Sequence, residues 1–154
     1  MKWLVTLLLS LFCVCTVSAE VVKIVDEKGK TVEIISRSMT EPWDKVDFSY
    51  SSPQFFLRFS KEYFSGKEAA LVIDGASPAL LTILAGKKER TTSGQYVSTS
   101  WFALDGLISR IHDAKSIEIR VYFFDQPSIT WHVPEEILQE WKLVIDTARA
   151  MKQQ

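Results

Sequence analysis

The stretch IEIRVYFFDQPSITWHVPEEILQEW, from Ile117 to Trp141, contains the clearest order of elements in this chain. Apolar and polar residues alternate over 117–124 and again over 129–133, which is typical of β-strands with one buried face. The intervening Asp-Gln-Pro-Ser favours a turn. Apolar residues then recur at helical spacing. The stretch therefore predicts a strand hairpin followed by a C-terminal helix around 134–151.

Strand patterns also precede this stretch. Two β-branched runs, 21–26 and 31–35, flank a polar turn with a glycine and predict a hairpin. Alternation predicts a strand at 54–59, and a nearly continuous apolar run predicts a strand buried on both faces at 69–75. The apolar run at 79–85 fits either a strand or a short buried helix.

A second helix is predicted around 100–113, where apolar residues recur at i, i+3, i+4 and i+7. These residues are Leu104, Leu107, Ile108 and Ile111. Ser100 is a suitable N-cap. The polar run at 87–95 predicts an exposed loop before this helix.

Together these elements predict an α+β fold. Its sheet is mostly antiparallel and either curved or folded into two layers. The amphipathic helix around 100–113 and the C-terminal helix around 134–151 complete it.

The N-terminus has the features of a secretory signal peptide. Lys2 precedes an apolar stretch at 4–17, and Val-Ser-Ala before Glu20 is a small-residue cleavage signal. Cleavage leaves one globular domain, 20–154, with no apolar run of the ~18 residues that a membrane span needs. We therefore expect export to the periplasm, with the extracellular space as the alternative.

Composition excludes several classes of function for the exported domain. Both cysteines, Cys13 and Cys15, lie in the predicted signal peptide, so thiol catalysis, disulfides and thiolate metal sites are excluded. Removal of Lys2 from 18 basic and 19 acidic residues leaves a net charge of −2. A nucleic-acid partner is therefore not expected, because such proteins present a basic face.

The segment His-Val-Pro-Glu-Glu at 132–136 resembles half of an acid/base or metal site. Pro134, however, pushes Val133 towards an extended conformation, which places His132 on the strand. Glu135 and Glu136 then lie in the first helical turn, beside the positive end of the helix dipole. The sequence therefore predicts no catalytic, metal-binding or cofactor-binding residue here, although His132 with Glu135 or Glu136 remains the alternative enzyme site.

The other ionisable residues give weaker signals. His112, followed by Asp113, is predicted to stabilise the C-terminal end of its helix. A site that joins His112 to His132 requires the fold to bring them together. Asp44 and Asp47 are predicted to lie in a solvated turn.

Aromatic residues suggest a surface for binding. Phe56, Tyr122 and Phe124 lie opposite the main apolar residues of their strands, and exposed apolar patches commonly mark binding sites. The short basic run near 87–90 could meet an acidic partner. The predicted interaction surface consists of Phe56, Tyr122, Phe124, Trp43, Lys87, Lys88 and Arg90.

The leading hypothesis is an exported, non-catalytic domain that binds another protein, as an inhibitor, immunity protein or envelope accessory does, without a cofactor. A homodimer through the aromatic face is a variant. One alternative is a carrier of a small apolar ligand, with a cavity lined by Phe55, Leu57 and Phe59. Another is a small hydrolase or metal-dependent enzyme that uses His132.

Overall fold

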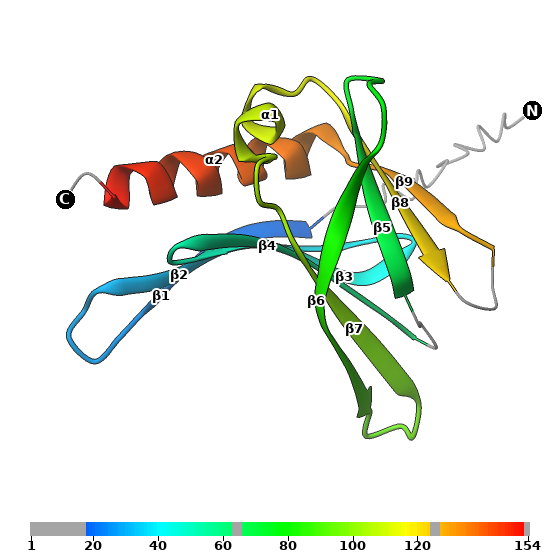
Figure 1. The fold of residues 1–154 in the computed structure, drawn as a ribbon. Helices are drawn as coiled ribbons and strands as arrows, with labels where there is room; N and C mark the ends of the chain where they lie inside the picture. The colour runs from blue at the N-terminus through cyan, green and yellow to red at the C-terminus, as the bar shows by residue number, and fades with distance from the viewer. Residues whose placement is uncertain (1–17, 63–65, 124–126, 153–154) are drawn as a thin grey trace, which may run out of the picture.

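The computed structural model describes residues 18–62, 66–123 and 127–152. Figure 1 shows a curled antiparallel sheet, a half-barrel, with a long and a short helix. The nine described strands are hydrogen-bonded in the order β1-β2-β3-β4-β7-β6-β5-β8-β9. The elements are β1 (Ser18–Val25), β2 (Thr31–Thr40), β3 (Trp43–Ser51), β4 (Gln54–Glu62), β5 (Gly66–Ile73), β6 (Ala79–Arg90), β7 (Tyr96–Ala103), α1 (Ile108–Asp113), β8 (Ile117–Phe123), β9 (Ile129–His132) and α2 (Glu135–Met151).

The strand order confirms a curved, mostly antiparallel sheet within an α+β fold. Strands β1 to β4 form a meander, and β4 then pairs with β7 rather than with β5. Since all nine strands belong to one sheet, the alternative of two sheet layers finds no support in this order. The predicted N-terminal hairpin is confirmed, and Gly29 in its turn has a φ of 75°, which suits glycine.

Helix α2 packs against one face of the sheet (Figure 1) and agrees closely with the predicted C-terminal helix. Its buried stripe includes Trp141, whose indole stacks on Phe48 with ring centroids 4.9 Å apart. Trp131 on β9 meets the same indole edge-on at 6.5 Å. Aromatic packing therefore ties α2 to β3 and to β9, the last strand of the sheet order.

The predicted helix around 100–113 is wrong over its first half. Residues 96–103, Ser100 included, form β7, and only Ile108–Asp113 form the helix α1. Pairing with β4 on one side and β6 on the other satisfies the backbone of β7, which overrides the local helical pattern. Gly106 has a φ of 74°, in the left-handed region, so a helix cannot run through it.

Two further predictions need correction or qualification. The polar run predicted as a loop begins inside β6, which extends to Arg90, and only the turn at Thr91–Gln95 remains. The signal peptide falls mostly outside the described residues, and cleavage before Glu20 would leave Glu20–Val25 of β1 paired with β2.

Neither described helix has the length and apolar character needed to cross a bilayer.

Candidate functional site

The face of the sheet opposite α2, here called the outer face, carries the candidate site. One cross-strand row crosses this face from β2 to β6. In this row Arg37 is paired with Asp47, Asp47 with Arg58, Arg58 with Trp101, and Trp101 with Ala85. Because side chains alternate between faces along each strand, register brings these residues from five strands side by side.

Asp47 is the centre of this row. Its side chain is completely buried, and its Oδ2 accepts a hydrogen bond from Nη2 of Arg58. The Nζ of Lys45 lies 3.4 Å from the same oxygen, and the Nε of Arg37 lies 3.5 Å from Oδ1. One buried carboxylate therefore holds three cations, and this group carries an excess of positive charge.

The cations are unequally exposed. Arg58 has 26% of its side chain exposed, whereas Lys45 and Arg37 are more open to solvent. Burial lowers the pKa of Arg58, while the nearby Glu33 raises it and Arg37 lowers it. Burial also lowers the pKa of Lys45, with Arg58 and Arg37 adding to the effect. The mutual repulsion of these cations makes the group receptive to a further anion.

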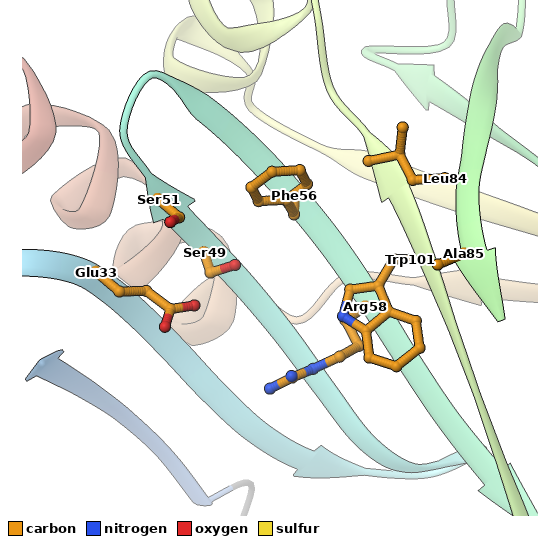
Figure 2. A pocket seen from close by; sticks show the side chains of 8 residues that line it. All are labelled: Glu33, Ser49, Ser51, Phe56, Arg58, Leu84, Ala85 and Trp101. Carbon is orange, nitrogen blue, oxygen red and sulfur yellow. The ribbon is translucent and has the colours of Figure 1, made fainter. Parts of the chain in front are cut away.

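An apolar groove of about 390 Å³ adjoins this group. Phe56, Leu84, Ala85 and Trp101 supply its apolar surface, and Figure 2 shows the indole of Trp101 beside the Arg58 side chain. The guanidinium carbon of Arg58 lies 6.0 Å from that ring centroid. The register of β6 shifts between Ile83 and Ala85, and this bulge directs both Leu84 and Ala85 to the groove.

A second hollow, of about 480 Å³, continues the groove past Arg58 and Trp101, which line both parts. This part is more polar. Lys87 and Glu89 form an ion pair on β6, and the hydroxyls of Ser60 and Thr99 lie 2.9 Å apart. The whole groove thus offers an aromatic and apolar end, a central guanidinium and a mixed-charge end.

Of the predicted surface residues, Phe56 and Lys87 line the groove. Trp43 does not belong to an exposed surface: it is only 3% exposed, and its ring packs 4.7 Å from that of Phe59. Strand β3 directs the ring of Trp43 towards the face of the sheet that α2 covers. The irregular sequence around Trp43 was therefore a poor basis for predicting that its ring is exposed.

The remaining predicted surface residues lie apart from the groove. Lys88 and Arg90 are exposed on the opposite face of β6 from Lys87, in register with Ser98 and Tyr96. Tyr122 is half-buried on β8, and Phe124 lies outside the described residues.

The histidines have separate partners. His132 is 79% exposed and lies 3.6 Å from Glu118 of β8, whereas Glu135 and Glu136 begin α2. His112 bridges α1 to α2, because its Nδ1 lies 2.9 Å from Asp113 and its Nε2 lies 3.0 Å from Asp146. The two histidines therefore share no carboxylate among the described residues.

The sequence interpretation missed the centre of the site. Asp47 is a buried strand residue, so the predicted solvated turn is wrong for it, while Asp44 is exposed. Arg58 lies within the predicted strand at 54–59 without a predicted role, and Trp101 lies within the segment predicted as a helix. The available signal was the alternation of Asp47 with Val46 and Phe48, which places Asp47 on the face opposite the core.

Within the described part of the chain, no group of three or more histidine, cysteine or acidic residues is arranged to hold a metal ion. Comparison of the chain with protein-family models, curated protein sequences and solved structures finds no match. The chemistry of the groove is therefore the basis for a functional proposal.

Proposed function

We propose that this chain is an exported domain that binds another protein through the groove on the outer face of its sheet. The observation that carries the proposal is the partly buried Arg58, held by Asp47 and flanked by Trp101. Arginine and aromatic residues are enriched among the residues that dominate binding energy at protein interfaces. Export rests on the N-terminal sequence alone.

The carrier hypothesis is less well supported by the packing. It needs a cavity between sheet and helix, lined by Phe55, Leu57 and Phe59. All three are buried. The ring of Phe55 lies 4.7 Å from that of Tyr50, and Phe59 contacts Trp43 at the same distance. These contacts favour a filled core, whereas the outer face offers open apolar surface.

Photo-crosslinking in cells of the source organism tests the proposal. A photoreactive benzoylphenylalanine replaces Leu84 at the groove, and a control carries it at Leu143, which is exposed on α2. We expect a discrete adduct with another protein from position 84 and none from position 143. Adducts at both positions, at neither, or only with a second copy of the chain would contradict the proposal.

Trp101→Ala then tests the groove directly. Replacing an interface residue of this kind by alanine lowers the binding free energy by about 2 kcal/mol or more, which corresponds to roughly 30-fold weaker binding. We expect the adduct from position 84 to be largely lost in this variant while its circular dichroism spectrum stays unchanged. An undiminished adduct would show that the groove does not carry the binding.

A further inference from the structure

Strand β6 has an open hydrogen-bonding edge. Along one side it pairs with β7 as far as Arg90. On the other side its pairing with β5 ends at Leu81 within the described residues. All residues from 82 to 90 are exposed. The backbone N–H and C=O groups along this edge therefore face solvent, as an edge that can accept another strand does.

The side chains of this edge are unusual for a strand that must stay unpaired. Ile83 and Leu84 have 43% and 49% of their surface exposed. Leu80, in the adjoining part that pairs with β5, is 73% exposed. Soluble proteins protect open edges with charges and bulges, and β6 has both. A purely protected edge would nevertheless be polar, whereas this one presents two large aliphatic side chains, Ile83 and Leu84, beside the backbone.

Charge identifies the chemistry of a complementary strand. Lys87 and Glu89 neutralise each other on the groove side of β6. Lys88 and Arg90 share the other side, two residues apart, and neither forms an ion pair within the part of the chain that the structure describes. Opposite charges directly across two strands are stabilising and like charges are not, so these cations favour acidic residues on a neighbour.

We propose that the edge of β6 accepts an extended segment of a partner protein as an added strand. The segment has apolar residues opposite Leu84 and acidic residues opposite Lys88 and Arg90. The inference goes beyond the proposed function, because main-chain pairing on this edge does not require the outer-face groove. An added strand would nevertheless lie directly beside the groove wall formed by Leu84 and Ala85.

A synthetic peptide of strand length is a suitable probe. In it valine alternates with threonine, and two aspartates at positions i and i+2 oppose Lys88 and Arg90. A control peptide has lysines in place of the aspartates. Titration is followed by the backbone amide signals in two-dimensional NMR. We expect shifts over Thr82–Arg90 and roughly tenfold tighter binding of the aspartate peptide.

Charge reversal provides the decisive comparison. The variant Lys88→Glu with Arg90→Glu should bind the lysine peptide in preference to the aspartate peptide. The matched control, Lys28→Glu with Lys30→Glu, reverses two cations of the same spacing in the β1–β2 turn and should leave the preference unchanged. Equal binding of both peptides by the wild-type protein would overturn the inference.

Other outcomes separate the two proposals. Trp101→Ala should keep the peptide response, because that residue lies on the face of the sheet and not on its edge. If Trp101→Ala abolishes the response, the peptide occupies the groove and edge pairing is refuted. If the amides of 82–90 are already protected in a protein that is dimeric by native mass spectrometry, the occupant is a second copy, which also refutes a partner strand.

Discussion

Replacement of Asp47 by asparagine should destabilise the protein measurably. Asparagine has nearly the same shape but carries no charge, so the fold loses the counter-ion of Arg58 without creating a cavity. The Arg58 guanidinium, only 26% exposed, then remains beside Lys45 and Arg37 with no buried carboxylate between them. A partly desolvated cation without a partner is the main source of the expected loss.

The size of the loss follows from the exposure of each partner. A hydrogen bond between charged groups contributes about 1.5–3 kcal/mol, which applies to the Arg58 contact. The contacts of Asp47 with Lys45 and Arg37 resemble surface ion pairs, each worth about 0–1 kcal/mol. We therefore expect Asp47→Asn to lower the free energy of unfolding by about 2 kcal/mol.

Urea denaturation followed by tryptophan fluorescence measures this change. With an m-value of roughly 2 kcal/mol per molar urea, the midpoint should fall by about 1 M. Asp44→Asn is the matched control, because Asp44 is an exposed carboxylate on the same strand. Its effect should stay within about 0.5 kcal/mol. Equal midpoints for Asp47→Asn and Asp44→Asn would refute a stabilising role for the buried carboxylate.

Two further predictions concern the core and the ionisable surface. Trp141→Ala should lower the free energy of unfolding, measured by urea denaturation, by about 3–5 kcal/mol because its indole is fully buried. Leu143→Ala, on the exposed side of α2, should lower it little. Similar losses for the two variants would contradict the packing. The backbone N–H groups of Ser116 and Lys115 each donate a hydrogen bond of 2.8 Å to Asp74 and lower the pKa of that carboxyl. The ionised carboxylate should therefore stabilise the fold near neutral pH, and this contribution should disappear as pH falls through the lowered pKa. An NMR titration that places the pKa of Asp74 at or above about 3.9 would contradict this.

Local periodicity was sufficient to predict most elements of the fold. The N-terminal hairpin, the strand at 54–59, the final hairpin and α2 each have a pattern that one face of a sheet or helix requires. Periodicity predicted the wrong structure at 100–107. Leu104 and Leu107 have helical spacing to the apolar residues of α1, so the predicted helix was extended too far towards the N-terminus. Strand pairing of β7 decides that segment, and pairing partners distant in sequence are invisible to local periodicity.

The candidate site could not be predicted because it depends on register. Arg58 and Trp101 are neighbours only because β4 pairs with β7, while β5 and β6 intervene in the sequence. A shift of one residue in that pairing would move Trp101 to the other face. Alternation within its own strand is enough to place Phe56 opposite the core, and Phe56 lines the groove.

The position of Asp47 bears on why a charged pair is present at all. For folding alone, apolar side chains of similar volume often serve as well as a buried ion pair, because desolvating two charges costs several kcal/mol. Asp47 instead fixes Arg58 against the indole of Trp101, on the face that α2 leaves uncovered. A cation held in place in this way loses less conformational entropy when it meets a partner. The desolvation cost of the pair is thus more readily explained by the proposed recognition of a partner than by the needs of the fold.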